Sequence, residues 1–274
     1  MAERFGDWQL DALVAVGGLG EVWRASSLKN VAPLRAPLRA LALKRLHTHL
    51  AHNDEASRQF AVEQRLAIEL PRHPNVVHGV DRGEVDDRPY VALELASGAD
   101  LRRMLAPPVT STGPAKRVAM PRARAIAIVA ATCDAVAHLH AHGWIHGDVN
   151  PGNLVVDESS VVLVDLGIAR HAGEAGAVRG THAYMAPEQV RGEAWTTATD
   201  VFALGVVLWE LVADARLFHR GPTWLSQAAV VEDPVPALAD PALDAIAQSA
   251  LVKDPAQRLA SASELAASLR AIAP

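Results

Sequence analysis

The feature that most constrains the fold of this chain is a change in hydrophobic pattern near residue 100. Before it, short apolar runs are broken by Gly, Asp or Pro, which predicts β-strands. The strand-like runs are WQLDALVAV (8–16), EVWRA (21–25), ALALKRL (40–46), NVVHGVDRGEV (75–85) and RPYVALEL (88–95). One helical run among them begins at Asn53 or Asp54 as its cap and stops before Pro71.

After residue 100 the apolar positions follow helical spacing. The predicted helices are RARAIAIVAATCDAVAHLHAHG (122–143), TDVFALGVVLWELVAD (199–214), PALDAIAQSALVKD (241–254) and SASELAASLRAIA (261–273). The two prolines of the doubled APLR predict that residues 26–40 are a loop insertion, with a basic docking patch as the alternative. The composition of residues 106–121 predicts a surface loop. A small β-rich part followed by a larger helical part predicts an α+β chain with two lobes and a cleft between them.

Composition excludes several classes of function. The chain has 274 residues and a formal net charge of −5, which gives no general attraction to nucleic acid. Cys133 is the single cysteine, so no intrachain disulfide forms and a reducing compartment is expected. The start lacks the apolar core of a signal peptide, and the most apolar stretch, 201–213, is too short to span a bilayer. We therefore expect a cytoplasmic protein with no membrane segment in this chain.

A glycine-rich stretch near the start is suited to binding phosphate. VAVGGLGEV (14–22) lies between two predicted strands, and glycines allow backbone N–H groups to approach an anion. Downstream, Lys44 lies in an apolar predicted strand, where a lysine is unusual unless it is paired. Glu63, on the following predicted helix, is the expected partner of Lys44.

Together with later motifs, these residues resemble the eukaryotic-like protein kinase family. After GGLGEV, LALK and Glu63 come HPNVV (73–77), LELASG (93–98), HGDVNPGN (146–153), DLG (165–167) and GTHAYMAPE (180–188). Asp200 in DVFALG and Arg258 in KDPAQR complete the series in the family's order. The resemblance implies one bilobal catalytic domain: a β-rich N-lobe with one main helix (about 7–94), a hinge (95–99) and a mostly helical C-lobe (100–274).

The resemblance also implies the role of each site residue. Lys44, held by Glu63, is expected to bind the α- and β-phosphates of ATP, and Asp148 to accept the proton of the substrate hydroxyl or to orient that hydroxyl. Asn153 and Asp165 offer the hard oxygen ligands that Mg²⁺ prefers, and Mn²⁺ is an alternative ion. The expected nucleotide-binding residues are Ala15, Val16, Gly17, Gly18, Gly20, Val22, Ala42, Lys44, Leu93, Glu94, Ala96 and Val155.

The activation segment indicates the type of substrate. Thr181, before Y-x-A-P-E, resembles the serine/threonine branch, in which the threonine hydroxyl helps to orient the catalytic aspartate. The expected partners are therefore proteins with serine or threonine acceptors. Glu188 and Arg258 are expected to form a buried ion pair that anchors this segment.

Two positions depart from the family pattern. Gly147 replaces an arginine that binds a phosphate on the activation segment, and residues 165–180 contain no Ser, Thr or Tyr. The missing arginine and the missing phosphate acceptors together predict a kinase that does not need phosphorylation of its activation segment. Asn150 replaces a lysine that contacts the γ-phosphate, a loss of about 10²–10³ in rate if nothing compensates. Arg170 and Arg179 are the candidate replacement cations.

Two other functions remain open from the sequence. Phosphotransferases of aminoglycosides and choline share H-G-D-x-x-x-x-N, although they usually lack the GTHAYMAPE segment and the residues matching Asp200 and Arg258. A nucleotide-binding pseudokinase is the second alternative, but Lys44, Asp148, Asn153 and Asp165 are all present. His138 and His142 have a spacing compatible with zinc, without the glutamate of a H-E-x-x-H pattern.

Overall fold

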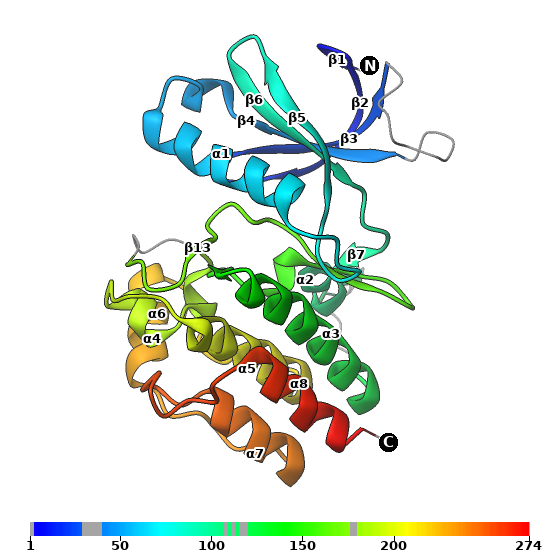
Figure 1. Ribbon diagram of the computed structural model, residues 1–274. Helices are drawn as coiled ribbons and strands as arrows, with labels where there is room; N and C mark the ends of the chain where they lie inside the picture. Colours follow the sequence, from blue (N-terminus) through cyan, green and yellow to red (C-terminus); the bar gives the residue numbers. More distant parts are fainter. Residues whose placement is uncertain are drawn as a thin grey trace. The chain divides into compact units, whose positions relative to one another are not determined.

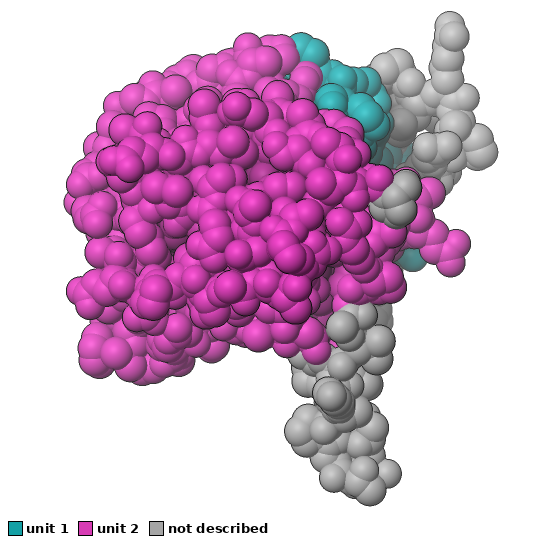
Figure 2. All heavy atoms as spheres, turned by 90° about the horizontal axis from the view of Figure 1, so that it is seen from below, with its two compact units in different colours: residues 1–96, 165–167 teal, residues 97–164, 168–274 magenta. Residues whose placement is uncertain are grey.

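The computed structural model describes residues 3–28, 40–106, 109–110, 113–114, 120–175 and 180–273. These form two compact units, coloured separately in Figure 2. Unit 1 comprises Met1–Ala96 and Asp165–Gly167, and unit 2 comprises Ser97–Val164 and Ile168–Pro274. Most of the predicted surface loops 26–40 and 106–121 lies outside the described residues.

Unit 1 is an antiparallel sheet with one long helix (Figure 1). Six strands lie in the order β1-β2-β3-β4-β6-β5. Their bounds are β1 Glu3–Phe5, β2 Trp8–Val16, β3 Gly20–Ser27, β4 Leu41–Leu46, β5 Gly79–Val85 and β6 Arg88–Glu94. The five predicted strands are confirmed, although β5 starts four residues later than its apolar run, and β1 was not predicted.

Helix α1 (Asp54–Glu69) packs against β5 and β6. Its cap is Asn53, whose side chain accepts a hydrogen bond from the Ala56 N–H at 2.9 Å. The helix ends at Glu69, with Leu70 as its C-cap directly before Pro71, as the sequence predicts. All six residues of β4 are buried, because this strand lies in the middle of the sheet. Lys44 therefore lies in the unit's interior.

Unit 2 is mostly helical, and its core surrounds α5 (Thr197–Ala213). Residues 198–211 of α5 are all buried, so the nearly continuous apolar pattern of this helix is explained by packing on all sides. α5 contacts α3 (Arg122–Ala141), α7 (Pro241–Ala250) and α8 (Ala262–Ala271). The remaining helices are α2 Leu101–Leu105, α4 Pro187–Val190, α6 Thr223–Glu232 and the 3₁₀ turns η1 Thr48–Leu50 (in unit 1), η2 Pro151–Asn153 and η3 His182–Tyr184.

A small sheet in unit 2, of order β12-β11-β7, positions the end of the HGDVNPGN motif (146–153). Strand β11 (Leu154–Val156) directly follows η2, and it pairs with β7 (Ala99–Asp100), which directly precedes α2. Gly98 permits this pairing, since an added β-carbon would lie 2.2 Å from the Val156 carbonyl oxygen and its φ is +111°. The start of α2 is thereby placed beside η2. The other strands are β8 Val109–Thr110, β9 Gly113–Pro114, β10 Trp144–Ile145, β12 Val161–Leu163 and β13 Arg170–His171.

Two structural features bear on the compositional expectations. Within the described part of the chain, no helix is long and apolar enough to cross a membrane. Cys133 is fully buried in α3, and burial raises the pKa of its thiol, which makes it an unreactive core residue.

Candidate active site

The centre of the site in unit 1 is the ammonium group of Lys44. Its Nζ lies 2.6 Å and 2.8 Å from the two carboxylate oxygens of Glu63 and 2.8 Å from Oδ1 of Asp165. The Lys44 and Glu63 side chains are 9% and 3% exposed, whereas that of Asp165 is 47% exposed. The predicted Lys44–Glu63 pair is therefore formed, and one carboxylate at the ammonium group is open to solvent.

Burial and charge oppose each other in this cluster. Burial alone lowers the pKa of Lys44, but the carboxylates of Asp165 and Glu63 outweigh burial and raise that pKa above its ordinary value. Burial raises the pKa of Glu63 to about 7, against the opposing effect of the Lys44 charge. Lys44 thus remains a cation although it lies in the interior, which is what phosphate binding requires.

Asp165 has a strained backbone. Its φ is +64°, in the left-handed region that non-glycine residues rarely adopt. The Gly167 N–H donates to Asp165 Oδ1 at 3.2 Å, and Gln59 Nε2 donates to the Gly167 carbonyl oxygen at 2.6 Å. The DLG motif therefore presents its carboxylate from a fixed turn, and α1 holds that turn through Gln59, a residue that the sequence analysis did not identify.

The glycine-rich stretch forms the turn between β2 and β3. The Gly17 N–H donates to the Gly20 carbonyl oxygen at 2.8 Å, and a β-carbon on Gly18 would meet nothing within 4 Å. Gly20 serves a different purpose, because an added β-carbon would lie 2.2 Å from the Arg45 carbonyl oxygen on β4. Ala15 and Val16 precede the turn at the exposed end of β2. Packing of the strands accounts for Gly20, whereas Gly17 and Gly18 lie where a ligand can approach the backbone.

Several predicted nucleotide-binding residues of unit 1 are neighbours on the sheet. Ala42 on β4 pairs with Leu93 on β6, and Val22 on β3 pairs with Lys44. Ala42 and Leu93 are 9% and 7% exposed. Glu94 forms an ion pair with Arg72 at 2.7 Å, and Ala96 is the last residue of this part of unit 1. Val155, another predicted nucleotide-binding residue, lies on β11 in unit 2 and is partly exposed.

Asp148 is the centre of the site in unit 2. Its Oδ1 accepts a hydrogen bond from the Thr181 N–H at 2.8 Å, and its Oδ2 accepts one from Asn153 Nδ2 at 3.0 Å. Asn153 Nδ2 also donates to the Asp148 carbonyl oxygen at 2.9 Å, so the amide oxygen of Asn153 is the side-chain atom that could bind a metal ion. The contact from residue 181 comes from its backbone, whereas the family resemblance implied its hydroxyl.

Side chains of α5 and α4 form hydrogen bonds with the backbone just before Asp148. The buried Asp200 carboxylate accepts hydrogen bonds from the His146 N–H and the Gly147 N–H, both at 2.8 Å. Gln189 Nε2 donates to the Gly147 carbonyl oxygen at 2.9 Å. Burial raises the pKa of Asp200, but hydrogen bonding and charge from His140 outweigh it and lower that pKa overall. Asp200 therefore stays ionised and preorganises the loop.

The space beside Gly147 is occupied by the indole of Trp195. A β-carbon added to Gly147 would lie 2.2 Å from Trp195 Cζ3, and the φ of Gly147 is +77°. The Arg170 guanidinium stacks on the Trp195 ring, with Cζ 3.8 Å from the ring centroid. The arginine expected by family resemblance has no room at position 147 in this structure.

Asn150 is buried, 1% exposed, and both ends of its amide are used. Its Nδ2 donates to the Asp148 carbonyl oxygen at 3.0 Å. Its Oδ1 accepts from the Gly152 N–H at 2.9 Å, which caps η2, and from Arg102 Nη2 at 2.7 Å. Of the two candidate replacement cations, Arg170 is engaged by Trp195 and the Ala175 carbonyl oxygen, and Arg179 lies outside the described residues. The cation found beside Asn150 is Arg102, which the sequence analysis did not identify.

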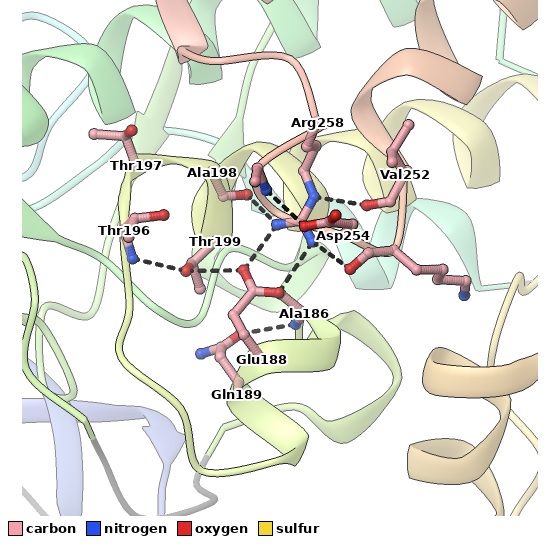
Figure 3. Close-up of polar contacts among 12 residues, drawn as sticks. Ala186, Glu188, Gln189, Thr196, Thr197, Ala198, Thr199, Val252, Asp254 and Arg258 are labelled. Atoms are coloured by element: carbon pink, nitrogen blue, oxygen red, sulfur yellow. Dashed lines mark hydrogen bonds and ion pairs between the residues drawn. The ribbon is translucent and has the colours of Figure 1, made fainter.

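Glu188 and Arg258 form the predicted buried ion pair (Figure 3). Arg258 Nη1 and Nη2 donate to the two carboxylate oxygens of Glu188 at 2.8 Å and 3.0 Å. The same guanidinium also donates to the carbonyl oxygens of Ala198, Val252 and Lys253. The arginine therefore ties the segment after the site to α5 and to the loop that follows α7.

Comparisons with known proteins agree with this geometry. The family model described as "Protein kinase domain" matches residues 17–268. The chain is 35% identical to the serine/threonine-protein kinase PknB of Mycolicibacterium smegmatis, and the match covers 96% of this chain and 42% of that protein. It is 32% identical to PknD of Mycobacterium tuberculosis, over 97% of this chain and 40% of that protein.

Solved structures give the same result. The crystal structure of the Mycobacterium tuberculosis PknI kinase domain is similar with a TM-score of 0.72 and 27% identity, over 98% of this chain and 97% of that one. The α+β fold predicted from the sequence is thereby confirmed. The motifs, the geometry around Lys44 and Asp148 and these matches lead to one assignment: the chain belongs to the protein kinase domain family.

Proposed function

We propose that this chain is a serine/threonine protein kinase that transfers the γ-phosphoryl group of ATP to protein hydroxyls. The observation that carries the proposal is the buried Lys44 ammonium, held between Glu63 and Asp165. Burial of an ion is costly unless the ion is paired, so a lysine kept charged in this position is suited to an anionic ligand. We further propose that unit 1 and unit 2 are the two lobes of a single catalytic domain, that it acts in the cytoplasm and that its partners are proteins.

Each residue has a defined part in the proposed reaction. The oxygen of a serine or threonine hydroxyl forms a bond to the γ-phosphorus, while the bond from that phosphorus to the bridging oxygen breaks and ADP leaves with the electron pair. Asp148, oriented by Asn153 and Thr181, takes the hydroxyl proton. Asn153 and Asp165 would hold Mg²⁺ through their side-chain oxygens, and the ion would neutralise charge on the phosphates. Lys44 binds the phosphates that are not transferred.

Protein, rather than a small alcohol, is the proposed acceptor. The segment GTHAYMAPE (180–188) is tied to the core by the Glu188–Arg258 pair. The Asp148 contact from Thr181 uses a backbone N–H, which every residue but proline offers, so that contact by itself does not select serine and threonine. The serine/threonine preference is supported by the relatives named as serine/threonine-protein kinases.

The acceptor is tested with purified protein, MgATP and two panels. One contains generic protein substrates, with phosphosites mapped by mass spectrometry, and the other contains amino alcohols, including an aminoglycoside and choline. We expect phosphoserine or phosphothreonine from the first panel and no transfer to the second. Transfer only to an amino alcohol would replace the proposal by the small-molecule alternative, and measurable MgATP binding without any transfer would replace it by the pseudokinase alternative.

We also propose that phosphorylation of the activation segment is not needed for activity. Residues 170–175 are held by contacts that contain no phosphate. β13 pairs with β10, the Gly173 N–H donates to the Trp195 carbonyl oxygen at 2.8 Å, and Arg170 stacks on the Trp195 ring. Trp195 thus fills the space beside Gly147 and also contacts Arg170 of the activation segment.

Arg170→Met is expected to lower kcat by up to roughly 30-fold, because a desolvated cation–π contact contributes about 2 kcal/mol. Faster hydrogen exchange across 170–175 should accompany the loss, and Arg170→Lys should retain part of both. Phosphatase treatment of the native protein should leave kcat unchanged. Loss of activity on phosphatase treatment, regained after incubation with MgATP, would show that a phosphate is required.

A further inference from the structure

The guanidinium of Arg102 is fixed beside the catalytic loop of unit 2. Arg102 is the second residue of α2, and its Nη2 donates to Asn150 Oδ1 at 2.7 Å. The other end of the same amide donates to the Asp148 carbonyl oxygen at 3.0 Å. One buried asparagine side chain therefore connects this cation to the backbone of the residue that is proposed to accept the hydroxyl proton.

Local packing brings the guanidinium to this place. The pairing of β7 with β11 sets the start of α2 beside η2, and Leu101 anchors the helix as a fully buried side chain. Gly152 then leaves room for the arginine, since an added β-carbon would lie 2.9 Å from Arg102 Cζ and 2.9 Å from Nη2. The φ of Gly152 is not in the left-handed region, so its lack of a side chain matters for space rather than for backbone conformation.

The guanidinium has bonding capacity beyond Asn150. A guanidinium carries five N–H donors, and the bond to Asn150 uses one of them. Arg102 is exposed as a residue although its Nη2 contact is partly buried. Its charge also acts on Tyr184, where it opposes the burial and the Glu210 charge that raise the pKa of that phenol. Arg102 is thus a positive charge on the side of unit 2 that carries Asp148 and the activation segment.

We propose that Arg102 supplies the cation for the phosphoryl group in transfer, in place of the lysine that position 150 lacks. The proposal rests on the proposed kinase activity. A planar fork of donors suits phosphate oxygens, and a fixed cation stabilises the charge that develops there. Asn150 acts as a positioning residue, because it caps η2 with one lone pair of Oδ1 and holds the guanidinium with the other.

The first test measures binding of a mimic of the transferred group, and it does not depend on a known acceptor. Calorimetry compares the affinity for MgADP with that for MgADP plus aluminium fluoride. We expect Arg102→Ala to weaken binding of the aluminium fluoride complex by at least about tenfold and to leave MgADP binding unchanged. Arg103→Ala is the matched control, since Arg103 is the next residue of the same helix and its side chain is 80% exposed.

The second test is the rate of transfer. Arg102→Ala should lower kcat by roughly 10²-fold with little change in the KM for ATP. The reason is that the proposed contact between the guanidinium and the phosphoryl group is made mainly in the transition state. Arg102→Lys should keep most of the rate, and Gly152→Ala should lower it by displacing the guanidinium without removing its charge.

Asn150→Lys alone should lower the rate, since it removes the cap of η2 and places a second positive charge beside Arg102. In the Arg102→Ala background, Asn150→Lys should restore activity.

The outcomes separate the two proposals. If native protein and Arg102→Ala bind MgADP with aluminium fluoride equally well and turn over equally fast, Arg102 is not the cation. An increase in rate for Asn150→Lys in the native background would likewise show that the site was uncompensated. If the native protein transfers nothing, the kinase proposal fails, while the affinity comparison still decides the role of Arg102.

Discussion

Asp148→Asn is expected to abolish detectable phosphoryl transfer while the affinity for MgATP stays unchanged. The carboxylate is the proposed proton acceptor, and general-base catalysis contributes roughly 10²–10⁴ in rate. An amide at this position keeps one oxygen, which can accept from Thr181, whereas its NH₂ group faces Asn153 Nδ2. The folded protein therefore loses at most the hydrogen bond from Asn153, whereas the reaction loses the group that accepts the hydroxyl proton.

The matched control for this variant is Asp233→Asn. Asp233 forms an ion pair with Arg220 at the surface of unit 2, with side chains 38% and 40% exposed. Exposed pairs contribute about 0–1 kcal/mol, so both stability and turnover should remain close to those of the native protein. Unchanged turnover in Asp148→Asn would refute the role assigned to Asp148.

Arg258→Met is expected to produce the largest loss of stability, about 3–5 kcal/mol in the free energy of unfolding. The side chains of Arg258 and Glu188 are 0% and 2% exposed, so removal of the arginine leaves a buried carboxylate without its counter-ion. Three backbone carbonyl oxygens lose their donor at the same time (Figure 3). Urea denaturation monitored by circular dichroism measures the change.

Two further variants show whether the loss comes from the unpaired charge. Arg258→Met combined with Glu188→Leu removes both charges and should be more stable than Arg258→Met alone. Arg220→Met removes an exposed arginine from a pair with Asp233 and should change the free energy of unfolding by less than about 1 kcal/mol. Equal losses from Arg258→Met and Arg220→Met would contradict the account of the buried pair.

Sequence patterns were sufficient for the five main strands and the long helices, and for the pairing of several candidate site residues. Burial of β4 on both faces explains why the run around Lys44 is mostly apolar, and burial of the Lys44 charge in turn requires the partner Glu63. The helix cap at Asn53 was readable because the residue before a helix must accept an N–H bond. These features depend on local spacing or on motifs of fixed order.

Arg102 and Trp195 could not be predicted in the same way. Each acts through contacts between segments far apart in the chain: α2 with η2 for Arg102, and residues 170–175 with 195 for Trp195. An arginine on a short exposed helix has an ordinary surface pattern, and nothing in its neighbours marks it. The available signals were indirect, namely a glycine at 147 and an asparagine at 150, which showed what was missing but not what replaced it.

The most direct measurement is transfer from MgATP by native protein that intact mass spectrometry shows to carry no phosphate, with Asp148→Asn as the background. The account predicts phosphoserine or phosphothreonine on protein acceptors, formed by the native protein from the first turnover and absent in the variant. No transfer above the background, despite saturating MgATP, would contradict the claim that this site, with Asn150 and Gly147 in place, is catalytically complete.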